Sequence, residues 1–549
     1  MAAQQQGKVS SDRGSSAGAA LDVVIRNGRV IDGTGNPAYH ADVAIQGDRI
    51  VKVGRLGQVH SALEIDAAGK IVAPGFIDAH SHSDATILAN PTAQSTIRQG
   101  ITTEVVGNCG TSRAPITRAA REQGSGGFGS FAEDDRDDYS FAEFLAAVEA
   151  MGTSGNLAWL VGHNSVRLVA GAGGPQASEE QLRAMERLLH EAFEAGAVGF
   201  STGLEFEPGR SCPPEEVHRL VGVAKHYDAL YASHIRNRAD RVLEALDEFL
   251  DVVRAWDLRG EVSHLNIRYN TGAPEGALEK CIERIEGART AGFDVLTDMT
   301  PLNFGIGQMA GILPPWLRRD GPAQAAVLLK DPAVRARLRT DCDRYWRFIH
   351  RGEWDRVRMQ NNPAFPELNG LDFPAISRLW NKDPWDCYFD ILAAAGGGMD
   401  GVVLVARLFT DEHLVETIGH PLYMLVVDGY STRTDGQLAR ETAYPLHFMG
   451  MAHFLTHHVR RNRTLSLEEA IRKMTSMPAT HFGLRDRGLL RQGSYADVVV
   501  LDFARLDTVA TVEDPLQYVK GVEHVFVNGV PVVFRGEHTQ ARPGRTLRR

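Results

Sequence analysis

Eight short apolar runs, separated by helical or loop stretches, recur through the middle of the chain. In chain order they are residues 70–80, 101–108, 157–163, 197–203, 229–234, 260–266, 293–299 and 423–429. Strands that alternate with helices are typical of a parallel α/β fold. Between the third and fourth runs, residues 178–196 form a strong amphipathic pattern, with Ser178 as its N-cap and Gly196 at its end. Eight such units predict a (β/α)8 TIM barrel.

Short β patterns also occur at both ends of the chain. Turn signals separate apolar runs there, namely Asn-Gly at 27–28 and 528–529 and Gly-Asp at 47–48. Such pairs favour hairpins because asparagine and glycine tolerate positive φ. The two ends are therefore predicted to form one small β-sandwich domain, with the barrel inserted between its halves.

The predicted layout follows from these patterns. More than a hundred residues separate the seventh and eighth runs, which is too long for a plain connection and predicts a lid over the barrel mouth. The acid- and glycine-rich residues 122–138 are predicted to form a surface loop. The segments are a disordered tail at 1–20, sandwich halves at 21–70 and 486–549, and a barrel at 71–485 with its lid at 303–420.

Composition narrows the classes of function. The net charge is −10 and hydrophobic residues make up 43% of the chain, so nothing resembles a basic nucleic-acid footprint. The five cysteines include no CxxC pair, which favours a reducing, cytoplasmic location. No apolar run is long enough to predict a membrane span, and the polar N-terminus does not resemble a signal peptide. A small-molecule substrate is the expected partner, and the oligomeric state is not predicted.

Candidate metal ligands stand at the ends of the predicted strands, where TIM barrels place their active sites. His80 and His82 follow the first strand, and alternation puts both rings on one face. Cys109 ends the second strand, and its thiolate would be a good zinc ligand. An HxH pair also occurs by chance, and a lone cysteine is more often a small buried apolar group.

Three more groups complete the pattern. His234 and His264 end the fifth and sixth strands at corresponding places, and Asp428 ends the eighth. Alone, each histidine is consistent with a core residue bonded to backbone, and the aspartate with a turn cap. Together the six predict one metal centre at the barrel mouth. Weaker candidates are Asp84, His163, Asp298 and His420, and Asp298 is expected to be a supporting group. His457 and His458 lie on a predicted helix and are expected to be solvated.

The motifs resemble those of a known family. "PGFIDAHSHSD", "GITTEVVGNCG", "GAVGFSTGLEFEPG", "YASHIRN" and "VSHLN" are similar to successive motifs of the N-acyl-D-amino-acid deacylases, which belong to the amidohydrolase superfamily. The resemblance runs from about residue 21 to the end of the chain. It implies a (β/α)8 barrel with a flanking β-sandwich. Strand four has no lysine, unlike hydantoinases, whose carboxylated lysine bridges two metals.

The resemblance also implies a cofactor and roles. It implies one or two Zn²⁺ ions, the tighter held by Cys109, His234 and His264. His80, His82 and Asp428 correspond to the second position, and Asp428 to the general acid/base. The implied reaction is hydrolysis of a linear amide by a metal-activated water.

Substrate-side positions depart from the family pattern. The chain has "DMTPL" where members carry "DxYPY", and Leu265-Asn266 where they carry His-Lys. These losses of tyrosine and lysine favour a bulkier or more apolar amide than a simple N-acyl-D-amino acid. Candidate substrate-binding residues are His163, Arg236, Arg268 and Arg440, the last shifted by one place from the expected arginine. The remaining alternatives are a cyclic amidase or lactonase using the same centre, or a non-catalytic scaffold.

Overall fold

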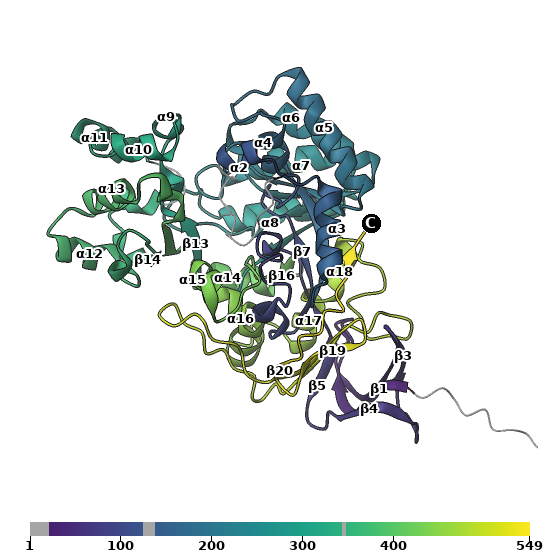
Figure 1. Cartoon of the computed structure of the whole chain (residues 1–549). Helices are drawn as coiled ribbons and strands as arrows, with labels where there is room; N and C mark the ends of the chain where they lie inside the picture. Colours follow the sequence, from purple (N-terminus) through teal and green to yellow (C-terminus); the bar gives the residue numbers. More distant parts are fainter. Residues whose placement is uncertain (1–20, 124–137, 343–346) are drawn as a thin grey trace, which may run out of the picture.

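The computed structural model describes residues 21–123, 138–342 and 347–549, which form three parts (Figure 1). The central part is a barrel of eight parallel strands in which each strand pairs with its neighbours in chain order. A parallel bridge between Ser81 and Gly429 links the segments that follow the first and last strands. The predicted fold class is confirmed. The strands are β6 (Phe76–Asp78), β7 (Ile101–Val106), β8 (Asn156–Gly162), β9 (Gly199–Gly203), β10 (Leu230–His234), β11 (Gly260–Val262), β12 (Val295–Met299) and β16 (Tyr423–Leu425).

Helices surround this barrel. The predicted helix is α5 (Glu179–Glu194), and it begins with a capping box. Ser178 Oγ accepts from the Gln181 amide at 3.2 Å, and Gln181 Oε1 accepts from the Ser178 amide at 2.8 Å. The other helices on the barrel are α1 (Gln94–Ile97), α2 (Arg118–Gln123), α3 (Phe141–Met151), α4 (His163–Val169), α6 (Pro214–His226), α7 (Val242–Trp256), α8 (Ala277–Thr290), α14 (Asp411–Gly419), α15 (Gly436–Glu441), α16 (Leu446–His453), α17 (Leu467–Lys473) and α18 (Ser476–His481).

Buried apolar side chains link the strands of the barrel. Ile77, Val105, Leu160, Leu230 and Met424, from five different strands, belong to one contiguous cluster and are almost fully buried. A TIM barrel is closed by such layers of branched side chains and is not a pore. This rigid core holds the ends of the strands in fixed relative positions, which is what a site assembled from several strands requires.

Both ends of the chain contribute to a second sheet, as predicted. Its order is β20-β19-β18-β17-β5-β1-β2-β3, with β4 paired to β1. β5 lies between a C-terminal strand and an N-terminal one, so the two ends fold as one unit. The strands are β1 (Leu21–Val30), β2 (Tyr39–Gln46), β3 (Arg49–Gly54), β4 (Ser61–Asp66), β5 (Ile71–Pro74), β17 (Val498–Leu501), β18 (Val522–Val527), β19 (Val530–Phe534) and β20 (Glu537–His538).

One of the three predicted turns is wrong. Residues 47–48 and 528–529 do connect neighbouring antiparallel strands, but Asn27 and Gly28 lie inside the continuous strand β1. Asn27 has φ 59°, and the register with β2 shifts between Ile25 and Gly28. The pair therefore forms a bulge, which needs the same positive φ as a turn. A Cβ on Gly28 would lie 2.4 Å from Val72 Cγ2, so close packing also requires glycine there.

The long insertion forms the third part, a lobe beside the barrel (Figure 1). Its sheet has the order β13-β15-β14, and its strands are antiparallel. The elements are β13 (Phe304–Gln308), β14 (Val357–Asn361), β15 (Val403–Arg407), α9 (Pro315–Arg318), α10 (Pro322–Leu328), α11 (Pro332–Asp341), α12 (Phe373–Trp380) and α13 (Pro384–Ala395). The predicted tail, and most of the predicted loop at 122–138, lie outside the described residues.

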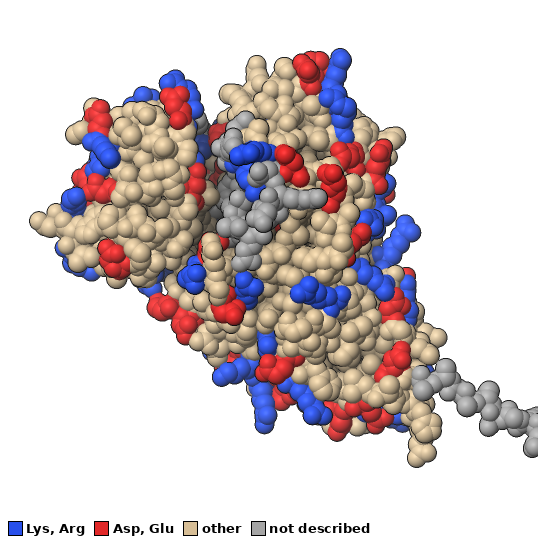
Figure 2. All heavy atoms as spheres, viewed as in Figure 1, with Lys and Arg blue, Asp and Glu red and all other residues tan. Residues whose placement is uncertain are grey.

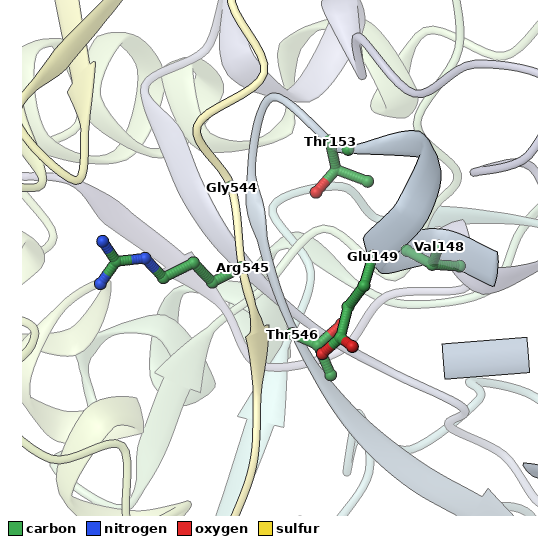
Figure 3. Close-up of a pocket in the computed structure, with 7 residues that line it drawn as sticks. Val148, Glu149, Thr153, Gly544, Arg545 and Thr546 are labelled. Carbon is green, nitrogen blue, oxygen red and sulfur yellow. The ribbon is translucent and has the colours of Figure 1, made fainter. Parts of the chain in front are cut away.

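The C-terminal segment runs back along the barrel. β21 (Thr546–Leu547) pairs in parallel with β8, and Arg548 forms an ion pair with Glu149 at 2.8 Å. A cavity of about 280 Å³ lies between this segment and the end of α3, lined in part by Thr153 and Arg545 (Figure 3). It holds none of the predicted site residues.

Three surface and chemical features complete the description. All five cysteines are buried and free of disulfides. Among the described residues, no helix combines the length and apolar character that crossing a membrane would need. On the face shown in Figure 2, acidic and basic side chains are interspersed.

Candidate metal centre

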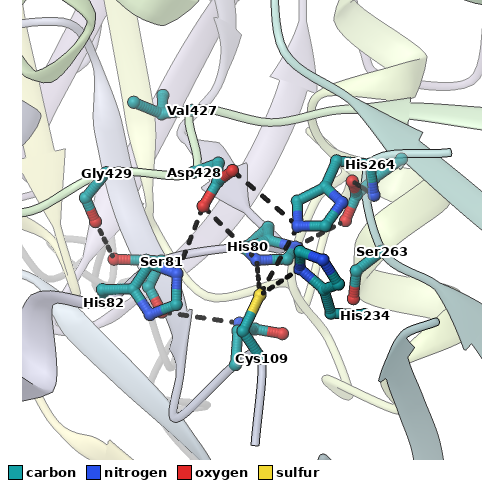
Figure 4. Close-up of polar contacts among 12 residues, drawn as sticks. His80, Ser81, His82, Cys109, His234, Ser263, His264, Val427, Asp428 and Gly429 are labelled. Atoms are coloured by element: carbon teal, nitrogen blue, oxygen red, sulfur yellow. Dashed lines mark hydrogen bonds and ion pairs between the residues drawn. The ribbon is translucent and has the colours of Figure 1, made fainter. Parts of the chain in front are cut away.

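Side chains from four strand ends meet around one sulfur atom (Figure 4). Cys109 Sγ lies 3.3 Å from His80 Nε2, 3.6 Å from His234 Nδ1 and 3.5 Å from His264 Nε2. All four residues are buried. These segments are far apart in the sequence, and the barrel brings them together because its strands are parallel and end at one mouth.

A second group of contacts surrounds the carboxylate of Asp428. Its Oδ1 lies 3.2 Å from His82 Nε2 and 3.5 Å from His80 Nε2, and its Oδ2 lies 3.9 Å from His264 Nε2. The Asp428 side chain is 28% exposed, whereas those of the histidines around it are almost fully buried. All six predicted ligands therefore converge, and Asp428 is the one that opens most to the cavity.

Three of the six residues have a left-handed backbone. The φ angles are 52° at Cys109, 37° at His264 and 55° at Asp428. Residues with side chains seldom adopt this conformation, and strain of about 1–3 kcal/mol each is typical of functional sites. The strand-to-loop turns that require it aim these side chains at the barrel axis.

Charges in the site favour ionised acids. Burial opposes ionisation of Cys109, but His80 and the other neighbouring histidines hold the pKa of its thiol well below the usual range. Burial likewise opposes ionisation of Asp428, yet His80 and His82 lower the pKa of its carboxyl. Burial and then the positive charge of Arg238 lower the pKa of His264, which keeps that imidazole neutral. Burial opposes protonation of His80 and His82, but neighbouring acids, including Asp428 and Cys109, raise the pKa of both rings. Thiolate, carboxylate and neutral imidazole are the forms that bind a metal, so a bound metal would displace the protons of these two rings.

Further side chains orient the candidate ligands. Asp298 lies 3.0 Å from His80 Nδ1, and its other oxygen accepts from the His264 amide at 2.5 Å. Glu205 Oε2 lies 2.7 Å from His234 Nε2. Carboxylates bonded to the second nitrogen of a ligand histidine fix its ring and its tautomer. The sequence indicated Asp298 in this role but did not indicate Glu205.

Two arginines support these contacts. Arg268 donates to both carboxylate oxygens of Glu205 at 2.6 Å, and both side chains are buried. Burial opposes ionisation of Glu205, but Arg268 and His234 hold its pKa well below the usual range. Arg238 Nη1 lies 2.8 Å from His264 Nδ1 and 3.0 Å from the His264 carbonyl oxygen. No sequence signal marks these pairings, because the partners come from different loops.

We expect Glu205→Gln to lower stability and metal affinity together. The variant leaves the buried Arg268 guanidinium without its carboxylate, and breaking a buried pair costs about 3–5 kcal/mol. His234 also loses its orienting partner, which typically costs about 10–100-fold in metal affinity. Urea unfolding and zinc titration measure the two effects. An Arg268→Met variant and the double variant complete a cycle, and a coupling near zero would contradict the pairing.

The site opens into a cavity of about 420 Å³. Asp428, Cys109, His82, His234 and His264 line its floor. The insertion supplies much of the remaining wall, including Phe304, Ile306, Asn361, Val403, Leu408 and Phe409. The insertion therefore supplies one side of the cavity at the barrel mouth, and its role as a lid stays a prediction.

The four candidate substrate-binding residues do not line this cavity. His163 Nε2 bonds to Glu216 at 2.7 Å, and Arg236 is held by Glu248 and the Arg210 carbonyl. Arg268 is held by Glu205, and Arg440 is exposed on α15. Among the described residues, Arg238 is the arginine or lysine that lines the cavity.

Three further residues considered in the sequence, Asp84, His457 and His458, lie outside the ligand set. Asp84 is buried and accepts from the Arg113 amide at 2.7 Å; it lies near His82 but does not line the cavity. His457 is partly exposed, but His458 is buried and contacts the Pro301 carbonyl. The interpretation of His458 as solvated is wrong, because the helix that carries it packs this residue against the segment after β12.

The donor set fits zinc in chemistry and in spacing. Zinc bonds of about 2.3 Å to sulfur and 2.0 Å to nitrogen, at tetrahedral angles, separate the two ligand atoms by roughly 3.5 Å. The sulfur–nitrogen distances of 3.3, 3.5 and 3.6 Å around Cys109 are close to that value. Two overlapping sets have ligand atoms that all lie within 4.8 Å of one another: His80 with Cys109 and His264, and His80 with His82 and Asp428.

Known proteins resemble the chain along almost its whole length. A sequence profile of the amidohydrolase family matches residues 63–211 and 435–533. An N-acyl-D-glutamate deacylase of Alcaligenes xylosoxydans xylosoxydans is 36% identical, over 96% of this chain and 97% of its own. A D-aminoacylase of the same organism is 30% identical, over 96% and 98%.

A solved structure shows the same relationship in three dimensions. The N-acyl-D-glutamate deacylase of Bordetella bronchiseptica, solved with zinc and a phosphonate that mimics the tetrahedral intermediate, matches with a TM-score of 0.79. It is 31% identical and is covered completely, by 96% of this chain. With a zinc-compatible centre at the expected strand ends and relatives that match from end to end, this chain belongs to the N-acyl-D-amino-acid deacylase family of the amidohydrolases.

Proposed function

We propose that this protein is a zinc-dependent hydrolase that cleaves linear amides of the N-acyl amino acid class. The observation that carries the proposal is the convergence of Cys109 with four histidines and Asp428 at the floor of one cavity. Cys109, His234 and His264 would hold the tighter zinc ion, and His80, His82 and Asp428 the second position. A scaffold without catalysis would not need to keep every one of these groups.

Asp428 is proposed as the general acid and base. Zinc, when bound, supplies an acidified water and polarises the amide carbonyl. The ionised Asp428 carboxylate, exposed to the cavity, accepts the proton that the attacking water loses. It then delivers a proton to the amide nitrogen as the carbon–nitrogen bond breaks. The products are a carboxylate and a free amine.

The walls of the cavity favour a large apolar acyl group. Phe304, Ile306, Leu408 and Phe409 lie on its lid side. Each methylene group of the substrate that becomes buried against these side chains contributes roughly 0.8 kcal/mol to its binding free energy. The positive charge of Arg238 at the wall would face a substrate carboxylate. Arg238 is proposed for this role instead of the candidates His163, Arg236, Arg268 and Arg440, because none of those four lines the cavity.

The test is a substrate panel on the zinc-loaded protein. It compares D and L forms of N-acetyl, N-octanoyl and N-benzoyl amino acids with ring amides and lactones. We expect linear amides to be hydrolysed, with kcat/KM at least about tenfold higher for octanoyl than for acetyl, as a hydrophobic pocket discriminates by 1–3 kcal/mol per methylene. Metal-stripped protein is the control.

Each outcome decides one part. Equal rates on acetyl and octanoyl substrates would reject the preference for large acyl groups, but the proposal of linear amide hydrolysis would stand. Faster turnover of ring substrates than of linear amides would mean that the protein is a cyclic amidase or lactonase. A zinc-loaded protein inert on the whole panel would favour the scaffold.

A further inference from the structure

Three histidines gather on the helix that leaves the catalytic cavity. His453 ends α16, and His457 and His458 lie on the π-helix that continues it, Phe454–Arg461. One ring nitrogen from each histidine lies within 4.8 Å of the other two. None of the three lines the cavity. The catalytic centre therefore does not account for this cluster.

The π-helix explains why these three rings meet. In an α-helix, residues four apart share a face, whereas residues five apart diverge. A π-helix has i→i+5 hydrogen bonds and a wider turn, so positions 453, 457 and 458 all fall on one side. The ring centroids of His453 and His457 are 4.8 Å apart, and those of His457 and His458 are 4.9 Å apart. π-helical segments are rare and occur frequently at functional sites, and this one spans eight residues.

His458 is prepared to accept a metal. Its Nε2 lies 2.9 Å from the carbonyl oxygen of Pro301, which can only accept, so Nε2 carries the proton. Nδ1 is then the nitrogen with a free lone pair, and this buried atom has no hydrogen-bond partner among the described residues. A ligand histidine commonly donates its other N–H to a backbone carbonyl in this way. The side chain itself is 1% exposed.

His453 presents a second ring nitrogen without a partner. Its Nδ1 is also buried and without a hydrogen-bond partner in the part of the chain that the structure describes. Burial, then the charge of His457, lowers the pKa of His453 to about 3, and burial lowers that of His458 to about 4. The rings are therefore neutral at physiological pH. Buried polar atoms are normally paired, so two unpartnered ring nitrogens in one histidine cluster call for an explanation.

We propose that His453, His457 and His458 form a separate binding site for one divalent transition-metal ion, with Zn²⁺ as the natural occupant. Imidazole is a ligand suited to zinc, copper and nickel and is poor for magnesium or calcium. Nitrogen ligands of tetrahedral zinc stand roughly 3.3 Å apart, so modest side-chain rotations close the present spacing. Arg461 lies near enough to oppose a cation, and Asp411 to favour one.

The position of the site indicates a structural role. Thr300 and His447 line the catalytic cavity. Pro301, which contacts His458, directly follows Thr300 in the chain. His447 lies on α16, the helix that ends at His453. All three ligands lie on one continuous helix, so a bound ion would stiffen the turn that carries His458, whose Nε2 contacts the Pro301 carbonyl next to the cavity-lining Thr300. It would not touch the substrate.

The test counts zinc on the intact protein. Wild type, His457→Ala and the His453→Ala/His457→Ala double variant are equilibrated at about 50 µM free zinc, and metal per chain is measured by mass spectrometry. We expect the double variant to lose one equivalent while kcat/KM stays within about twofold, because the site is separate from the reacting groups. His226→Ala, which removes another helical histidine outside the cluster, should keep every equivalent.

A second measurement separates metal binding from packing. Thermal midpoints are recorded with and without added zinc, and zinc should raise the midpoint of wild type more than that of the double variant. Equal zinc content and equal midpoint shifts in wild type and double variant would overturn the proposal. Where an alanine variant does not fold, His453→Gln and His457→Gln keep the side-chain volume and carry the same test. The result does not depend on the identity of the hydrolysed amide.

Discussion

Asp428→Asn is expected to lower kcat on the best N-acyl amino acid by about 10³-fold, within the range of 10²–10⁴ that general acid–base catalysis contributes. Asparagine keeps the shape of the side chain but cannot accept and return a proton. The ligands proposed for the tighter zinc, Cys109, His234 and His264, remain in place. Steady-state kinetics with zinc measured on the same sample therefore separates lost proton transfer from lost metal.

Asp84→Asn provides a matched control. Asp84 is also a buried aspartate close to His82, but it bonds to the Arg113 amide and does not line the cavity. It should change kcat far less than Asp428→Asn does. If Asp428→Asn kept the wild-type rate with zinc bound, the proposed acid/base role would be rejected. If zinc and activity fell in parallel, Asp428 would act as a ligand first.

Cys109→Ser is expected to remove both bound zinc and activity, with kcat/KM reduced by at least about 10³-fold. Cys109 Sγ is the atom that three histidines surround, and a buried thiolate is the softest donor in the set. A serine hydroxyl is not deprotonated under these conditions and binds zinc far less tightly. Zinc content after dialysis, and activity at saturating zinc, measure the two losses.

Cys387→Ala is the companion variant for this experiment. Cys387 is equally buried, but it lies on α13 in the insertion, and burial raises the pKa of its thiol to about 11. It should retain zinc and activity. A Cys109→Ser protein that keeps its zinc through dialysis would mean that Cys109 is only a small buried side chain, the alternative that the sequence left open.

Local patterns predicted much of this molecule because they report local physics. Period-two alternation predicted that His80 and His82 share a face, and both reach Asp428, although strand β6 itself ends at Asp78. The capping box of α5 is complete within four residues, at Ser178 and Gln181. The turn predicted at Asn27 is wrong because the prediction used only local information. Positive φ is a local property, whereas the choice between a bulge and a turn depends on which strand pairs with β1.

The barrel, the terminal sheet and the six groups of the proposed centre could be predicted from the chain, because strand periodicity and ligand type are properties of individual residues and their near neighbours. Which distant groups meet was settled by the tertiary structure. It paired Arg268 with Glu205, turned four expected substrate-binding residues away from the cavity, and buried His458 against Pro301. Loops that follow different strands come together only when the barrel closes, so local sequence patterns cannot predict the contacts between them.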